Sequence, residues 1–237
     1  MSYHRRKIAV AIFAAAAVAG ACADSTGSRG MGTVEVTMQQ VSAPMAQLAE
    51  VFLSPTGATA RVEKEKVDSL FVWFSRIGFL PVDSMAADSS DSTSADSTDS
   101  GDDDVYPWIW MDLDSVVRID LMALPGEADS VVVIAAGSVP AGTYHKLRMI
   151  VADADIYFND EIPVGNRVYD PDTKYTVDIP SGAQSGLKTR TWFTVDADAD
   201  TGDPLGVNVL FDPNMTFNNV TATGSGRVKI TPVLKTR

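Results

Sequence analysis

The strongest constraint on the fold is a Pro–Gly turn that leads directly into an alternating strand, within residues 137–151. Pro140 fixes its own φ, and Gly142 can adopt the positive φ that other residues resist. After the turn, Lys146 and Arg148 alternate with apolar residues. A period of two predicts a β-strand with one buried face and one solvent face.

Short segments of strand character recur along the chain and are separated by turn residues. The predicted strands are residues 32–38, 66–80, 105–111, 116–121, 130–135, 155–158, 167–169, 175–179, 186–194, 205–211 and 227–234. Residues 42–53 instead have helical spacing, and we expect a short helix there. Many short strands, close turns and little helix predict an all-β, antiparallel β-sandwich of the immunoglobulin-like or prealbumin-like kind.

One stretch inside this domain has a different composition. Residues 83–104 consist almost entirely of Asp, Ser, Thr and Ala, and Met85 is their only large apolar residue. Such a stretch buries too little apolar surface to offset the entropy of ordering, so we interpret it as a disordered acidic loop between two strands. A loose calcium-binding or partner-binding segment is the alternative.

The N-terminus has the pattern of an export signal over residues 1–21. Three cations at residues 5–7 precede an apolar stretch at 8–18 that is too short to span a membrane comfortably. Small residues then precede Cys22, which resembles a bacterial lipobox, although Ala19 stands where Leu is usual. The resemblance implies cleavage before Cys22, lipidation of Cys22, and a flexible tether over residues 22–31. An ordinary signal peptide with an incidental cysteine is the alternative.

The charge and the cysteine content of the chain limit which disulfides it can form and which classes of partner it can bind. Cys22 is the only cysteine, so no disulfide can form within the chain. The formal net charge of −12 becomes −15 once the cations at 5–7 leave, which argues against nucleic acid as a partner. We expect a membrane partner through the lipid anchor and leave a protein or glycan partner open. Asp24 does not follow Cys22 directly, which favours the outer membrane, facing either the periplasm or the cell surface.

Five segments resemble, in order and spacing, motifs of one bacterial family: residues 120–124 (DLMAL), 139–148 (VPAGTYHKLR), 179–188 (IPSGAQSGLK), 209–212 (VLFD) and 230–234 (ITPVL). On these motifs, residues 32–235 are similar to the family called domain of unknown function 4382. The resemblance implies a β-sandwich on an exported, usually lipid-anchored protein that has no catalytic residues. Residues 42–53 and 83–104 depart from the compact family pattern.

Side chains for the common kinds of catalysis are scarce. His145 is the only histidine that remains after cleavage, whereas a zinc site needs three or four ligands. We therefore interpret His145 as a packed or edge residue. The chain has no G-x-S-x-G elbow, P-loop or dinucleotide fingerprint. We expect no enzymatic activity, no catalytic residues, no metal and no resident cofactor.

A calcium site is the alternative to the expectation that the chain binds no metal. The candidate ligands are Asp196, Asp198, Asp200 and Asp203, whose spacing resembles the start of a calcium loop. The sixth and twelfth positions hold Thr201 and Val207 in place of the Gly and Glu of an EF-hand. A solvated hairpin is the simpler interpretation, and a structural calcium site stays open.

Aromatic residues supply the other candidate site. Trp108 and Trp110 share one face of a predicted strand, and Tyr106 has the same parity. An exposed row of this kind could stack on sugar rings, but we favour the interpretation that one Trp face fills the sandwich core. Trp73 and Trp192 lie in apolar strands, and we predict that both belong to the core.

Together these observations predict a non-enzymatic cell-envelope lipoprotein whose sandwich acts as a binding or structural module. Two alternatives stay open. An envelope hydrolase or carbohydrate-processing accessory would need a cleft with two carboxylates at catalytic separation. A calcium-stabilised, adhesin-like surface domain would lose thermal stability on chelation.

Overall fold

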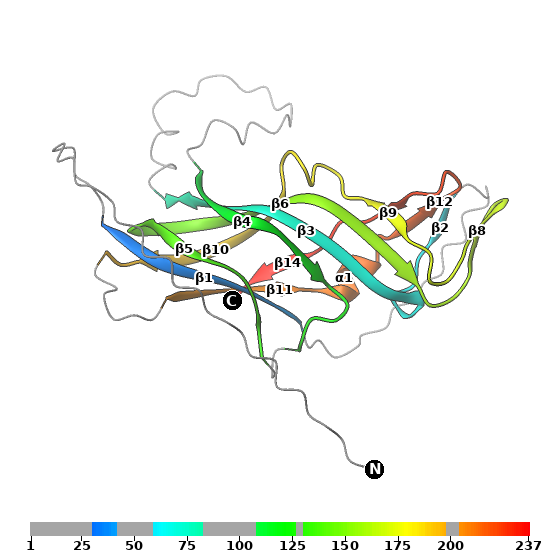
Figure 1. The fold of residues 1–237 in the computed structure, drawn as a ribbon, viewed down its shortest axis with the longest axis horizontal. Helices are drawn as coiled ribbons and strands as arrows, with labels where there is room; N and C mark the ends of the chain where they lie inside the picture. Colours follow the sequence, from blue (N-terminus) through cyan, green and yellow to red (C-terminus); the bar gives the residue numbers. More distant parts are fainter. Residues whose placement is uncertain (1–29, 42–58, 83–107, 127–129, 198–203) are drawn as a thin grey trace, which may run out of the picture.

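The computed structural model describes residues 30–41, 59–82, 108–126, 130–197 and 204–237 (Figure 1). The signal sequence, Cys22, the helix predicted at 42–53 and the acidic stretch 83–104 lie outside these residues. The described chain is mostly β, with mixed sheets and one short α-helix. The prediction of a β-rich chain is therefore confirmed at this level.

The first sheet contains four strands. Their order is β14 (Leu234–Thr236), β11 (Leu205–Phe211), β1 (Met31–Gln40) and β5 (Val132–Pro140). Strand β1 pairs antiparallel with β5 but parallel with β11. Its inward residues Val34, Val36 and Met38 have no exposed surface, as the alternation of the sequence predicts.

The second sheet contains eight strands. Their order is β2 (Thr59–Arg61), β12 (Thr221–Thr223), β13 (Val228–Lys229), β9 (Tyr175–Asp178), β6 (Gly142–Phe158), β3 (Val67–Pro81) and β4 (Ile109–Asp120), and β10 (Leu187–Val195) pairs with β6. Strands β7 (Ile162–Val164) and β8 (Arg167–Tyr169) form a separate ribbon. A 3-10 turn covers Lys64–Lys66, and α1 covers Pro213–Phe217.

The Pro–Gly turn carries the chain from the first sheet to the second. Strand β5 ends at Pro140 and β6 begins at Gly142, whose φ is 155°. The Tyr144 hydroxyl donates to the Pro140 carbonyl at 2.6 Å, and the Ala141 amide donates to the Gly30 carbonyl at 2.6 Å. The turn is thus fixed from both sides, and the long strand β6 starts from a defined point.

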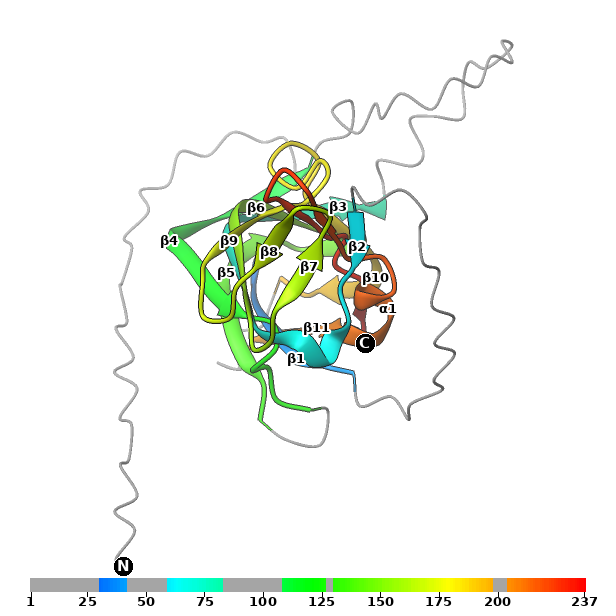
Figure 2. The same ribbon diagram turned by 90° about the vertical axis from the view of Figure 1, so that its right-hand side faces the viewer.

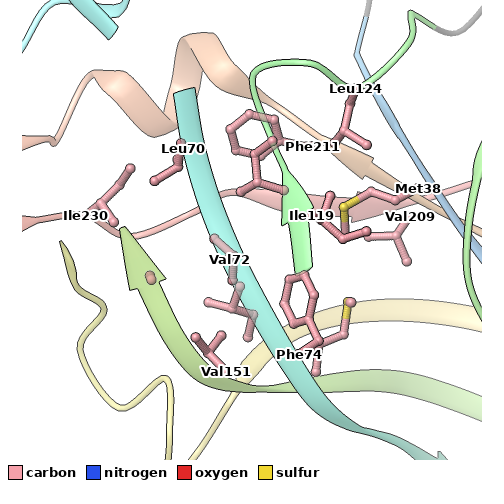
Figure 3. Packing of buried hydrophobic residues seen from close by; sticks show 14 of the residues in the cluster. Met38, Leu70, Val72, Phe74, Ile119, Leu124, Val151, Val209, Phe211 and Ile230 are labelled. Carbon is pink, nitrogen blue, oxygen red and sulfur yellow. The ribbon is translucent and has the colours of Figure 1, made fainter. Parts of the chain in front are cut away.

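Both sheets contribute to one hydrophobic cluster. Viewed end-on, the strands are arranged around a shared interior (Figure 2). Figure 3 shows Met38 and Val209 of the first sheet in the same packing region as Val72 and Phe74 of the second. All four side chains have no exposed surface. Burial of this kind is the main favourable term in folding, so the two sheets stabilise each other.

The expectation of purely antiparallel sheets is wrong at two places. Strand β1 pairs parallel with β11, and β13 pairs parallel with β9. Alternation of side chains identifies a strand but says nothing of the direction of its neighbour. The direction depends on which distant segments meet, and that is decided by the fold as a whole.

Several predicted strand boundaries also change. Residues 109–120 form the single strand β4, where two strands were predicted. The register of β4 against β3 shifts between Asp112 and Val117, which is where the alternation of the sequence is interrupted. Residues 155–158 continue the 17-residue strand β6 across a bulge at Ala152, which lies between the paired residues Val151 and Asp153. The predicted strand 227–234 is instead the short strand β13 followed by irregular chain, and it reaches only the first residue of the separate strand β14.

Candidate functional site

The outer face of the second sheet gathers aromatic and charged side chains. Along β3, Val72 and Phe74 turn inward with no exposed surface, while Phe71 and Trp73 are half-buried and Arg76 is exposed. Strands β4 and β6 flank β3, and β10 lies beside β6. The outward residues of these four strands form the candidate site.

One part of this face is the Trp–Arg cluster, which we define as Arg76, Gly78, Trp108, Trp110 and Arg148. The register places Gly78 between Trp110 of β4 and Arg148 of β6. The two indole rings lie 6.1 Å apart. The Arg76 guanidinium carbon lies 4.8 Å from the Trp110 ring centre, and that of Arg148 lies 5.4 and 5.5 Å from the two rings. These distances suit cation–π attraction.

Gly78 makes the close approach of the indoles possible. A Cβ at this position would lie 2.9 Å from the Trp110 ring and 3.1 Å from the Trp108 ring. Both distances are shorter than ordinary contacts between carbon atoms. A glycine inside a strand commonly marks such an approach, and here it leaves room for the rings against the sheet.

The two arginines of the cluster differ in environment. Arg148 is only 4% exposed, and its Nη2 donates to the Gln184 carbonyl at 2.5 Å. Arg76 is exposed, and its Nε lies 2.6 Å from Asp112 Oδ1 in a surface ion pair. A planar guanidinium can stack on rings while it donates in plane, so both side chains are held in fixed positions.

A second stack lies further along the same face. The Arg118 guanidinium carbon is 3.5 Å from the Phe71 ring centre and 5.3 Å from that of Trp73. Tyr157 of β6 meets Phe71 edge-on, with ring centres 5.9 Å apart. The outer face therefore holds guanidinium groups against aromatic rings at two places.

His145 and Trp192 lie beside the Trp–Arg cluster. His145 is 4% exposed and sits at a bulge where β6 meets β10, with its ring centre 5.9 Å from that of Trp192. Burial, and then the charge of Lys146, lower the pKa of His145 below its usual value. The imidazole is therefore neutral at neutral pH, which agrees with its interpretation as a packed residue.

The four tryptophans differ in burial. Trp108 is buried, at 9% exposed, and packs with the half-buried Trp110 on the outer face of the second sheet instead of in the main hydrophobic cluster. Trp73 is half-buried on the same face. Trp192 is 68% exposed, so its assignment to the core is wrong. Burial alternates along β10, and Trp192 has the same parity as the exposed Lys188 and Arg190, so strand alternation places its indole outward.

Only one of the four candidate calcium ligands lies among the described residues. Asp196 is exposed just after β10, while Asp198, Asp200 and Asp203 lie outside the described residues, as does Cys22. Within the described ranges, no group of three or more His, Cys, Asp or Glu side chains could hold a metal ion. Calcium binding by the aspartates and lipidation of Cys22 therefore stay predictions.

The arginine partners of the tryptophans were not predicted from the sequence. Arg76, Arg118 and Arg148 reach the rings only through the strand register, which joins segments about 30 to 70 residues apart. Gly78 was the one local signal, since a glycine inside an apolar strand often marks a close approach.

The described strands define a domain of mixed β-sheets with arginine–aromatic stacks on one outer face. The chain belongs to the family described as Domain of unknown function (DUF4382), whose model matches residues 32–232. This match confirms the family resemblance seen in the sequence. No curated protein and no solved structure matches the chain. Among the described residues, no helix is long and apolar enough to cross a membrane.

Proposed function

We propose that this chain is a cell-envelope lipoprotein, anchored through Cys22, whose β-domain is a non-enzymatic binding module. The proposal includes a sandwich of the immunoglobulin-like or prealbumin-like type and export to the outer membrane. The lipobox-like segment before Cys22 and the family match support the first part. The arginine–aromatic stacks on the outer face support the second.

The single observation that carries the binding role is the Trp–Arg cluster. Its arginines are held against indole rings and by Gln184 or Asp112, so their positions are set before any ligand arrives. A ligand then loses less affinity to the ordering of side chains. Guanidinium and indole groups suit anionic and ring-bearing ligands and supply no nucleophile.

Mass spectrometry of the processed protein tests the anchor. We expect a new N-terminus at Cys22 that carries lipid, and a Cys22→Ala chain that is released from the membrane fraction. Cleavage at another position, or a Cys22 without lipid, would overturn the anchor. Protease treatment of intact cells then places the domain, because loss of the full-length band indicates the surface and protection until lysis indicates the periplasm.

A carbohydrate-binding role is the second candidate, and the exposed indole of Trp192 favours it. An exposed indole can stack on a sugar ring, with polar side chains beside it to fix orientation. Binding of the purified protein to soluble envelope glycans, with loss of that binding in Trp192→Ala but not in Val168→Ala, would support this role. Equal binding by both variants would contradict it.

A further inference from the structure

Two cross-strand pairs bring four cations to one surface. Strand β10 pairs with β6 so that Lys188 lies opposite Arg148 and Arg190 lies opposite Lys146. The intervening pairs contain the buried residues Leu187, Met149, Thr189 and Leu147, so the four cations share the outer face. We call Lys146, Arg148, Lys188 and Arg190 the cationic patch.

The patch is unusual for this chain. Like charges directly opposite each other on neighbouring strands are destabilising, and here two such pairs are adjacent. The whole chain has a formal charge of −12. Lys188 and Arg190 are exposed, the half-buried Lys146 lies beside them, and Arg148 is buried next to Lys188 in the Trp–Arg cluster. Desolvation by the surrounding protein lowers the pKa of Lys188 below its usual value.

Two large apolar side chains are exposed near the patch. Trp192 follows Arg190 on the same strand and is 68% exposed. Met31 begins β1 and is 53% exposed. The start of β1 lies against the end of β10, because a Cβ on Gly32 would lie 2.5 Å from the Asp196 carbonyl oxygen. Tryptophan is enriched where proteins meet the surface of a lipid bilayer, and basic residues are drawn to anionic lipids.

The described chain begins at this same end. Gly30 is held by the Ala141 amide, at the turn that starts β6. Eight residue steps separate Gly30 from Cys22, which can span at most about 28 Å when fully extended. A lipid on Cys22 therefore keeps Gly30 within that distance of the membrane, and the turn and the chain just after β10 lie next to Gly30.

We propose that the cationic patch and Trp192 rest on an anionic phospholipid surface, so that the domain is held in one orientation on its membrane. This inference rests on the proposed lipid anchor. Carboxylates elsewhere on the chain are repelled by anionic headgroups within about one Debye length, roughly 10 Å, whereas the exposed cations of the patch are attracted over the same range. Asp196 lies at the same end and weakens this attraction.

The test uses the processed lipoprotein reconstituted into vesicles. Lipidation of Cys22 leaves no free thiol, so a cysteine introduced at Thr194 can be labelled with a fluorophore at a single site. Val168→Cys provides the matched control, because Val168 is exposed on the distant strand β8 (Figure 1). We expect a spin-labelled lipid to quench the probe at residue 194 but not at 168, in vesicles that contain phosphatidylglycerol.

Reversing the charge of two patch residues tests whether the patch itself holds the domain on the membrane. In the Lys188→Glu/Arg190→Glu chain we expect at least a tenfold loss of the fraction of protein that shows the quenched state, since each basic residue near such a surface contributes about fivefold. The Arg227→Glu/Lys229→Glu chain, with the same charge change at exposed positions in and next to β13, should behave like the unchanged protein. Vesicles of phosphatidylcholine alone, or high salt, should abolish the difference between the two probes.

Three results would overturn the inference. Equal quenching at 194 and 168 in a lipidated chain would contradict it and leave the anchor intact, whereas absence of lipid on Cys22 would overturn the proposed function as well. The stretch 83–104 holds eight aspartates and connects β3 to β4 in the sequence. If quenching at 194 appears only after Asp102, Asp103 and Asp104 are changed to Asn, the native patch is occupied by the chain's own carboxylates instead of the membrane.

Discussion

Gly186 fixes the loop that supports the buried Arg148. Its φ is 65°, and a Cβ there would lie 2.7 Å from the Met149 carbonyl oxygen. Its amide donates to the Ser181 carbonyl at 2.9 Å, which closes the loop that presents the Gln184 carbonyl to Arg148. Backbone conformation and space therefore both require glycine at this position.

We predict that Gly186→Ala lowers the free energy of unfolding by about 1 to 3 kcal/mol, because the left-handed φ and the contact with backbone both become strained. Gly206→Ala is the control, since a Cβ at Gly206 meets nothing within 4 Å. Urea unfolding curves measure both. A loss in Gly206→Ala as large as in Gly186→Ala would contradict the explanation.

Asp212 links α1 and β14 through one carboxylate. It is the N-cap of α1, where its Oδ1 accepts from the Met215 amide at 3.0 Å, and its Oδ2 lies 2.8 Å from Lys235 Nζ of β14. The side chain is 5% exposed. Burial alone would raise the pKa of Asp212, but these hydrogen bonds and the charge of Lys235 lower it below its usual value of 3.8.

A lowered pKa means that ionised Asp212 stabilises the folded state above about pH 4, and that this stability is lost as pH falls through the folded-state pKa. We predict that Asp212→Asn, which keeps a capping side chain, costs about 1 to 2 kcal/mol at pH 7 and less at pH 3. Thermal unfolding at both pH values measures this. Asp160→Asn, which removes an exposed ion pair with Lys66 but keeps a side-chain oxygen that can accept from the Glu161 amide, should have little effect at either pH.

At the scale of single elements, β3 connects the core to the outer face. Its inward residues fill the shared hydrophobic cluster, while Gly78 opens space for two indoles on the other side. We predict that Gly78→Ala displaces the rings, changes near-ultraviolet circular dichroism and costs about 1 to 3 kcal/mol. An unchanged aromatic spectrum would show that the rings do not depend on this gap.

Sequence patterns located individual strands well but not their pairing. The predicted segments 32–38, 66–80 and 205–211 correspond closely to β1, β3 and β11. Alternation is a local property, so it survives in any fold that buries one face. The parallel pairing of β1 with β11 joins segments about 170 residues apart, which no local pattern encodes.

Bulges and caps explain the remaining errors at the element scale. An extra residue reverses the alternation within β6, so one long strand resembled two. Helix α1 is only five residues long, although Asp212 and Pro213 are the residue types expected at its N-cap and first position. The candidate site was likewise predicted only in part. Local alternation placed Trp108 and Trp110 on one face, but the arginines that contact them are brought there by strand pairing, which no local pattern shows.

At the scale of the whole molecule, the two sheets are joined at their edges as well as across the core. Strand β14 pairs with β11 of the first sheet, and its Thr236 hydroxyl donates to the Arg190 carbonyl of β10 in the second at 2.5 Å. Residues of both sheets share one buried cluster. A change in one sheet should therefore be felt by the other.

The distribution of tryptophan allows this coupling to be measured. All four indoles belong to the second sheet or the residue just before its strand β4, whereas Val36 lies in the first with no exposed surface. We predict that Val36→Ala lowers the free energy of unfolding by about 2 kcal/mol. It should shift the tryptophan fluorescence transition and the far-ultraviolet circular dichroism transition to the same denaturant concentration.

Thr33→Ala, at an exposed position of the same strand, is the matched control and should shift neither transition appreciably. If the circular dichroism transition of Val36→Ala moved while the fluorescence transition stayed in place, the sheets would unfold independently. A common shift would mean instead that the outer face is held rigid by the whole interior. The arginines and indoles of that face would then keep their positions only while both sheets are folded. The first sheet, whose inward residues are buried, would be a structural requirement of the proposed binding surface.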